Sequence, residues 1–253
     1  MDFLYIISGA IVGFIVGLTG VGGGSLMTPL LVLGFNIPPS IAVGTDLLYA
    51  AITKSSGIFT HHRLKNIQWS IVKQLSLGSI PGSIVCIAAI KYFNITAQTF
   101  NSIISITLGF MLILTSAVIL FKDKLAQLFK QRHTYQPNQS GIIAIGGILG
   151  VLVTLSSVGA GAIGGALLLL LYPTLKTRAI VGTDIAHAVP LTAIAGLGHL
   201  QLGHVDFNLL MSLLIGSIPA IYIGTQVGEK LPEKFLKYLV ATILLLIGIK
   251  FAI

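Results

Sequence analysis

The sequence predicts an all-α, polytopic helical membrane protein made of two inverted repeats of about five helices each. Three observations support this prediction. First, 55% of the residues are hydrophobic and only 9% are charged, with a mean hydropathy of +0.97, whereas soluble domains carry about 25% charged residues. Second, most apolar runs approach the roughly 20 residues that a membrane helix needs. Third, the second half of the chain repeats the first.

The first repeat is expected at residues 1–121, followed by a basic cytoplasmic linker at 122–140. A glycine cluster at 20–24 separates the first apolar run from a short one, so this pair is expected to be a broken helix. The five apolar runs of the first repeat lie at residues 3–18, 25–35, 41–60, 69–93 and 99–121.

The second repeat is expected at residues 141–253 and follows the same order. A second glycine-rich break, at 159–165, again separates a long apolar run from a short one. The five runs of this repeat lie at residues 141–155, 166–172, 180–200, 208–227 and 235–253.

Three ungapped matches at one offset of 138 residues establish the duplication. Chance is a poor explanation for three matches at the same spacing, and internal repeats are common in secondary transporters. The matches are residues 43–46 (VGTD) with 181–184, residues 78–81 (GSIP) with 216–219, and His61 with His199.

The distribution of basic residues predicts the orientation of the two repeats. With five crossings in each half, eleven Lys and Arg residues fall on one side of the membrane and only Lys91 and Lys250 on the other. Because cytoplasmic loops carry the excess of Lys and Arg, both termini are expected outside the cell. An alternative count of eight spans, with re-entrant short segments, would leave the repeats parallel. The eleven residues are Arg63, Lys65, Lys122, Lys124, Lys130, Arg132, Lys176, Arg178, Lys230, Lys234 and Lys237.

The first glycine cluster is a candidate anion site. Irregular backbone at membrane depth is tolerated only where protein buries it or where it lines a cavity. A helix that begins there directs its free N–H groups and its positive dipole end at the gap, which favours an anion. The predicted substrate-binding residues are Gly22, Gly23, Gly24 and Ser25. The alternative is a tight helix contact or a simple turn.

The second break contributes Gly159 and Gly161 to the predicted binding site. Residues 159–164 also match the dinucleotide pattern GxGxxG, with Asp184 about 20 residues further along. That pattern requires a preceding strand in a βαβ unit. Here the flanking segments are apolar membrane runs, so dinucleotide binding is not expected.

Asp46 and Asp184 are the acidic residues that lie well inside apolar runs. A charged side chain there costs roughly 2.5–3.5 kcal/mol on insertion scales, so such residues usually have a function. Both are predicted to carry a coupling proton, together with His187 one turn beyond Asp184. Thr45 and Thr183, which precede the two aspartates, are predicted to bind substrate. The alternative is that both carboxylates cap helix N-termini.

Three further residues inside apolar runs are candidates for a role in the site. Lys54, two turns beyond Asp46, is a possible charge partner for a carboxylate or an anion, or else extends to the membrane interface. Pro81 and Pro219 occupy matched positions and kink their helices, either as gating kinks or as fixed bends.

Several function classes are not expected. The net charge of +8 is spread over short loops rather than gathered in one patch, which argues against nucleic-acid binding. The chain has a single cysteine and no HExxH or GxSxG pattern, so no catalytic group, metal or cofactor is expected. The histidines near loop edges are expected to be interfacial.

The duplicated motifs resemble the sulfite exporter TauE/SafE family of membrane permeases, of the 4-toluene sulfonate uptake permease type. The resemblance covers nearly the whole chain and lies in residues 20–29, 43–45, 78–82 and 181–183. It implies transport of sulfite, sulfonates or related anions, without an ATPase subunit and with ion coupling. The second half departs from the pattern, because it lacks the triple glycine and has leucine where Pro29 would recur.

The expected function is therefore secondary transport of a small sulfur-containing anion, coupled to protons, in the inner membrane. The expected partners are the substrate, the proton and the lipid bilayer. The oligomeric state and the direction of transport are left open. The alternative within transport is an exporter of a cation or neutral metabolite that uses the two aspartates as its binding site. A membrane enzyme or a structural membrane partner is a more distant alternative.

Overall fold

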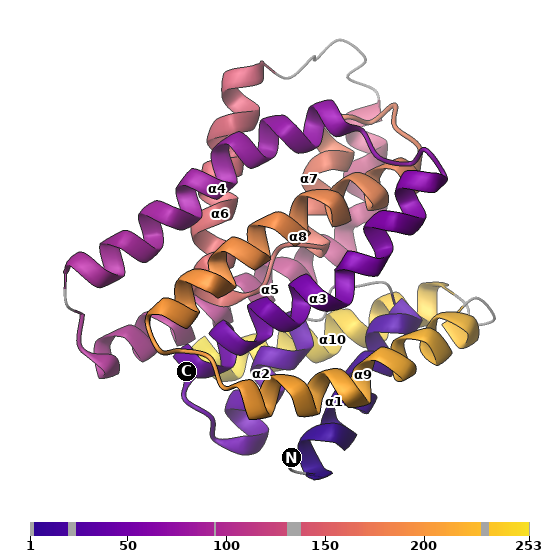
Figure 1. Ribbon diagram of the computed structural model, residues 1–253. Coiled ribbons are helices and arrows are strands. Elements are labelled where there is room, and N and C mark those ends of the chain that lie inside the picture. The colour runs from indigo at the N-terminus through magenta and orange to yellow at the C-terminus, as the bar shows by residue number, and fades with distance from the viewer. Residues whose placement is uncertain (1–2, 20–23, 94, 131–137, 229–232, 253) are drawn as a thin grey trace.

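The computed structural model describes residues 3–19, 24–93, 95–130, 138–228 and 233–252, which form ten helices and no strand (Figure 1). The predicted order of long and short apolar helices is confirmed. The helices are α1 (Phe3–Thr19), α2 (Gly24–Phe35), α3 (Pro39–Arg63), α4 (Trp69–Tyr92), α5 (Ala97–Lys130), α6 (Gln139–Ser156), α7 (Ala162–Leu171), α8 (Thr177–Gln201), α9 (Phe207–Gly228) and α10 (Glu233–Ala252).

Five of these helices, α4, α5, α6, α8 and α9, are long and apolar enough to cross a membrane within the described residues. The helix α3 is long enough as well, but Asp46, Lys54 and a basic last turn make it more polar. Large apolar side chains such as Phe110, Ile148 and Leu246 are more than half exposed, as expected where helices face lipid. The chain is a polytopic helical membrane protein.

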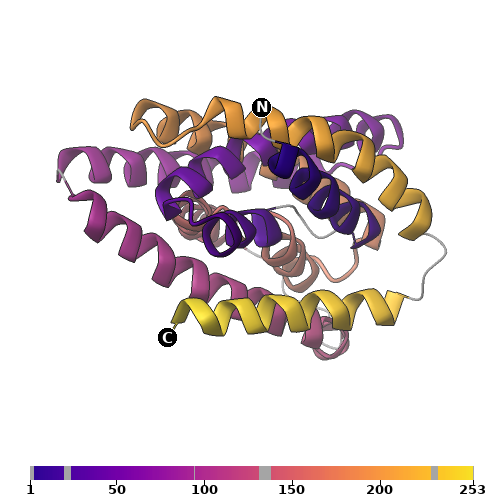
Figure 2. The ribbon, with the colours of Figure 1, turned by 90° about the horizontal axis from the view of Figure 1, so that it is seen from below.

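Equivalent helices of the two halves cross in opposite directions. In the α3–α8 pair, Gly57 faces Ile185 and Gly196 faces Leu48, so residue numbers rise along α3 as they fall along α8. The α5–α10 pair behaves alike: Gly109 faces Gly248, and the Ser116 hydroxyl donates to the Ala241 carbonyl at 2.7 Å. In Figure 2, α10 is the yellow helix along the lower edge, beside the end of α5.

Antiparallel equivalents mean that the halves are inverted, which confirms the inverted-repeat prediction. Four crossings per half would leave the halves parallel, so the eight-span alternative does not agree with the structure. The helices α2 and α7, with 12 and 10 residues, are about 18 and 15 Å long at 1.5 Å per residue. Both are shorter than a hydrocarbon core of about 30 Å, so the fifth crossing of each half needs the adjoining glycine break and loop as well as the short helix.

The first helix of each half packs along the fourth helix of the other half. Glycines line both contacts, α1 with α9 and α4 with α6, and let the two backbones approach closely. Residue numbers rise together along both partners, so each pair is parallel. The facing residues are Gly9 with Leu213, Gly13 with Ser217, Gly17 with Ile221, Gly146 with Leu75, and Gly150 with Ser79.

The boundary between the repeats differs in one respect from the expected linker at 122–140. The helix α5 continues through Lys130, and α6 begins at Gln139, so the start of that segment is a helical extension of the first repeat. The division into a first repeat, a linker and a second repeat remains our proposal for the domain organisation.

Candidate functional site

The break between α6 and α7 supplies the irregular backbone at the centre of the site. The helix α6 ends at Ser156, and the following cap residue, Ser157, has a φ of 56° in the left-handed region. Gly159 and Gly161 follow with φ of 114° and 147°, values that a residue with a Cβ rarely adopts. The sequence Ser157–Gly161 therefore turns sharply before α7 begins at Ala162.

The two glycine breaks meet. A Cβ added to Gly24, the first residue of α2, would collide with the Ser157 carbonyl, so α2 begins directly against the second break. Gly24, Ser25 and Gly159, which the sequence predicted for the site, line one small cavity together. Gly161 precedes α7 beside that cavity, whereas Gly22 and Gly23 lie outside the described residues. The remaining lining residues are Thr115, Ser157, Val158, Ala160 and Ala162.

The cavity has polar walls with unmet hydrogen-bonding capacity. Thr115 and Ser157 are 0% and 3% exposed, and neither hydroxyl has a partner among the described residues. Such groups are costly to bury unless a ligand or water satisfies them. The cavity volume of about 10 Å³ is close to the space that the centre of one water molecule needs. In this conformation the cavity therefore has room for at most one water molecule and not for a larger ligand.

Asp46 lies between α2 and the second break. Its Oδ2 atom accepts a hydrogen bond of 2.5 Å from the Thr28 hydroxyl, and the Ser157 side chain lies beside the same carboxyl group. Its Oδ1 atom has no hydrogen-bond partner among the described residues. Asp46 is fully buried, so one of its carboxylate oxygens is left without a partner close to Ser157, which lines the cavity.

Asp184 occupies the equivalent position in the second half. Its Oδ1 atom lies against Gly164 in the first turn of α7, where a Cβ would collide with it, and has no hydrogen-bond partner in the described part of the chain. Each aspartate therefore contacts the short helix of its own half. The helices α3 and α8 begin at Pro39 and Thr177, so the alternative that the aspartates cap their own helices does not fit.

Lys54 connects these groups. Its ammonium donates to the carbonyl of Ala160 in the second break, and it lies within electrostatic reach of Asp184 and Asp46. The equivalent position in the second half is Thr192, whose hydroxyl bonds the Ala188 carbonyl of its own helix at 2.9 Å. The site therefore has one ammonium group close to two carboxylates, and the second half has no equivalent of this lysine.

His187 lies one turn beyond Asp184 but is held by the other half. Its Nε2 atom and the Ser79 hydroxyl of α4 share a hydrogen bond of 2.8 Å. The equivalent pair is Tyr49 and Ser217, whose side chains also lie close together. The sequence did not assign a role to either serine, although both belong to the duplicated GSIP motif.

Thr45 and Thr183 bond to backbone N–H groups rather than lining the cavity. The Thr45 hydroxyl accepts from the Asp206 N–H at 3.1 Å, and the Thr183 hydroxyl accepts from the Gln68 N–H at 3.0 Å. Both N–H groups lie just before the fourth helix of the opposite half, where helix geometry leaves them unpaired. The threonines thus join the two halves.

The glycines beside these threonines explain why the VGTD motif is duplicated. A Cβ on Gly182 would lie 2.7 Å from the Asn66 carbonyl, and a Cβ on Gly44 would collide with the His204 carbonyl. Small residues are therefore required where each central helix meets the loop of the other half. Pro81 and Pro219 lie inside α4 and α9, near the Ser79 and Ser217 contacts.

A sulfite exporter TauE/SafE family model matches residues 5–251. The chain belongs to this family. The predicted resemblance is confirmed over nearly the whole chain.

Curated relatives of this TauE/SafE protein carry the names of transporters. It is 41% identical to the probable membrane transporter protein YjnA of Bacillus subtilis, over 99% of each chain. It is 29% identical to the probable membrane transporter protein YdhB of the same organism, over 90% of each chain. A probable membrane transporter protein of Methanocaldococcus jannaschii is also 29% identical, over 97% of this chain and 93% of the relative. No solved structure matches the chain significantly.

Proposed function

We propose that this TauE/SafE family membrane transporter moves a small sulfur-containing anion, such as sulfite or an organosulfonate, in exchange for or together with protons. The observation that supports this most directly is the cavity where the two breaks meet. The first residues of α2 and α7 and two unpartnered hydroxyls converge there. Helix N-termini and hydroxyl donors stabilise an oxyanion without a fixed cation at contact distance.

The substrate site is centred on Ser25, Gly159, Thr115 and Ser157 in this proposal. The cavity is too small for an oxyanion in the present conformation, so binding requires the two breaks to separate. Movement of one inverted half against the other opens such a site to alternate sides of the membrane. The transporter lies in the cell membrane with both termini outside, because the basic loops then face the cytoplasm.

The three charged side chains provide the coupling. When Asp46, Asp184 and Lys54 are all ionised, their total charge is −1, which repels an anion from the cavity. A proton on one carboxyl makes the group neutral, and a second makes it +1. An anion therefore enters most readily with one or two protons. Lys54 then releases the Ala160 carbonyl, which frees the second break to move. His187 passes protons only if its bond to Ser79 breaks.

The test is uptake into proteoliposomes of radiolabelled sulfite, sulfate and a small sulfonate, with and without an imposed pH gradient. We expect gradient-dependent accumulation of at least one anion. Lys54→Met should reduce the uptake rate at least tenfold, whereas Lys73→Met, which removes an exposed lysine of α4, should leave it unchanged. Thr115→Val should raise the KM about tenfold, the loss expected for one hydrogen bond to a charged ligand. No flux of any anion from folded protein would refute the proposal.

The two buried carboxylates also support a second candidate, export of a cation or a neutral metabolite. In that case the free Oδ1 atoms of Asp46 and Asp184 are substrate ligands. Asp46→Asn and Asp184→Asn then abolish substrate binding itself. For a proton-coupled anion transporter, the same variants keep anion binding and exchange but lose the response to the pH gradient. Counterflow of labelled anion without a gradient separates the two functions.

A further inference from the structure

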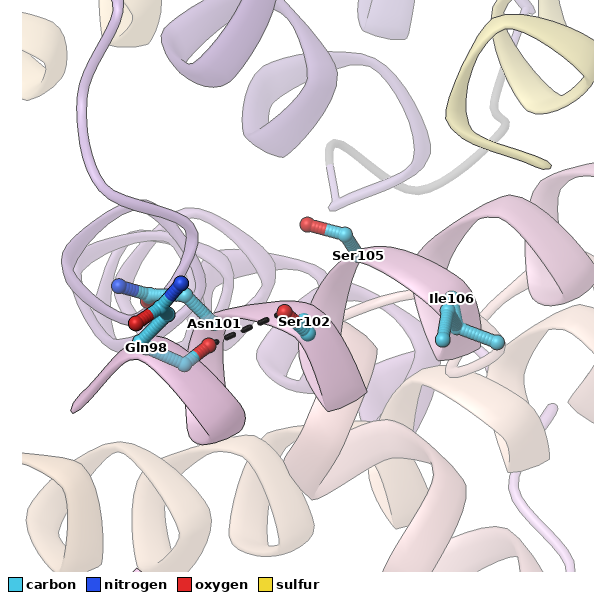
Figure 3. A pocket seen from close by; sticks show the side chains of 5 residues that line it. All are labelled: Gln98, Asn101, Ser102, Ser105 and Ile106. Atoms are coloured by element: carbon cyan, nitrogen blue, oxygen red, sulfur yellow. Dashed lines mark hydrogen bonds between the residues drawn. The ribbon is translucent and has the colours of Figure 1, made fainter. Parts of the chain in front are cut away.

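A second hollow lies at the N-terminal end of α5, away from the cavity at the breaks. Its volume is about 440 Å³, within the range of small-molecule sites. Figure 3 shows its lining side chains along one stretch of the helix, with the Ser102 hydroxyl donating to the Gln98 carbonyl at 3.1 Å. The lining residues are Gln98, Asn101, Ser102, Ser105 and Ile106.

The hollow offers neutral hydrogen-bond donors. The Asn101 carboxamide oxygen accepts from the Ser40 N–H at the start of α3 at 3.0 Å, which leaves its NH2 group to face the hollow as a donor. Ser105 adds a hydroxyl donor, whereas the Ser102 hydroxyl donates to the Gln98 carbonyl. No charged residue lines the hollow. Weak, uncharged donors of this kind suit an oxyanion that passes through rather than one that is held.

The face of α5 that carries Asn101 and Ser105 continues into the protein. At 100° per residue, Asn101, Ser105, Leu108, Leu112 and Thr115 share that face. Asn101 and Ser105 are half-buried, whereas the last three are fully buried. Thr115 lines the cavity at the breaks. Ten residues separate Ser105 from Thr115, about 15 Å along the helix.

Three apolar side chains separate the hollow from the cavity. Leu108, Met111 and Leu112 are each 0% exposed, and we call them the apolar seal. The Met111 methyl group lies 2.9 Å from the position of a Cβ on Gly159, so the seal packs directly against the second break. Opening of that break therefore removes packing from the seal.

We propose that the hollow is the outer entrance for the anion and that the apolar seal is its closed gate. This inference rests on the proposed function and adds the route to it. The proposed entrance exists at one end of the molecule only, because the equivalents of Asn101 and Ser105 on α10 are the apolar residues Leu239 and Ile243. The starts of α3 and α5 lie on the side with few basic residues, which the charge distribution assigns to the exterior.

The test is the reaction of introduced cysteines with a membrane-impermeant sulfonatoethyl methanethiosulfonate, in intact cells and in inside-out vesicles. The native Cys86 is first replaced by alanine. Ser105→Cys should react from the outside only. Phe110→Cys is the matched control, because it lies on the opposite face of α5 and is 58% exposed, where lipid excludes the reagent. Ser102→Cys serves as a second probe if Ser105→Cys does not fold.

The seal is tested in the same way. Thr115→Cys should be unreactive, and Leu108→Ser with Leu112→Ser should raise its outside reaction rate at least tenfold. In transport assays, Ser105→Trp should slow uptake at least tenfold, whereas Ser105→Thr and Phe110→Trp should not.

Different outcomes separate the two proposals. Unreactive Ser105→Cys and Ser102→Cys, or reaction from both sides, would overturn the entrance even if the wild-type protein transports a sulfonate. A disulfide between Ser105→Cys chains would assign the hollow to a contact between copies, and would also overturn it. One-sided reaction that continues through the opened seal would support the entrance even if no tested anion is transported.

Discussion

Removal of the Thr183 hydroxyl should loosen the junction between the two halves. In Thr183→Val, the Gln68 N–H at the start of α4 loses the acceptor that it contacts at 3.0 Å. The equivalent variant Thr45→Val removes the acceptor for Asp206 N–H before α9.

The magnitude follows from known losses at helix starts. Removing the acceptor at a helix N-terminus costs about 0.5–2 kcal/mol. Both threonines are 0% exposed, so the upper part of that range, about 1–2 kcal/mol, applies. Such a loss lowers the melting temperature of a chain of this size by about 2–8 °C, at 2–4 °C per kcal/mol. Both threonines have the same geometry, so the two variants should lose similar stability, and the double variant should lose about the sum.

The assay is thermal unfolding in detergent followed by intrinsic fluorescence. Trp69 is the single tryptophan of the chain and directly follows Gln68, so Thr183→Val should shift its emission in the folded state, whereas Thr45→Val should not. Thr183→Ser keeps the hydroxyl and should resemble the wild type. Thr192→Val is a second control, since that hydroxyl only bonds its own helix.

A melting temperature of Thr183→Val within about 1 °C of the wild type, with unchanged Trp69 emission, would refute the structural role. If anion binding were lost at the same time, the threonines would be substrate ligands, as the sequence alone suggested. A loss of stability with unchanged binding would instead leave the cavity residues as the ligands.

Two further predictions concern packing and pH. Gly13→Ala places a Cβ 2.7 Å from the Ser217 Cα and should lower the stability by about 1–3 kcal/mol through overpacking. In the control Gly165→Ala, the new Cβ meets nothing within 4 Å, and the stability should rise by about 0.4–1 kcal/mol. Melting temperatures measure both changes, and equal melting temperatures for the two variants would refute the close contact of α1 with α9. Burial lowers the pKa of His204 in the loop before α9, so the folded state binds fewer protons than the unfolded state there. Stability should therefore fall as the pH drops below about 6.5, and His204→Gln should reduce that dependence; the same pH profile in both proteins would argue against it.

The order, approximate bounds and inverted arrangement of the helices followed from the sequence. Hydropathy and the glycine breaks define the helices, and the basic loops define their direction. The bounds differ most at α5, which continues to Lys130, beyond the end of the apolar run at Phe121. Hydropathy locates the apolar part of a helix and not the point at which the helix ends.

The site was predicted less completely. The sequence identified the two breaks and the two aspartates, because glycines and carboxylates are unusual at membrane depth. It did not identify Thr115 or Ser157, because an isolated hydroxyl in an apolar run carries no pattern of its own. It also placed Thr45 and Thr183 among the ligands, since a sequence does not show which partner from a distant segment a hydroxyl meets.

The first helix of each half packs against the fourth helix of the other half, and this arrangement limits when each contact can form during synthesis. The α4–α6 contact can form once the sixth helix has entered the membrane. The glycine face of α1, in contrast, has its partner at residues 213–221 and must wait until almost the whole chain has been synthesised. Contacts this distant in sequence carry the largest closure entropy and form late. The first helix to be synthesised is thus among the last to make its native contacts, and each half lacks one packing partner until the other half is present.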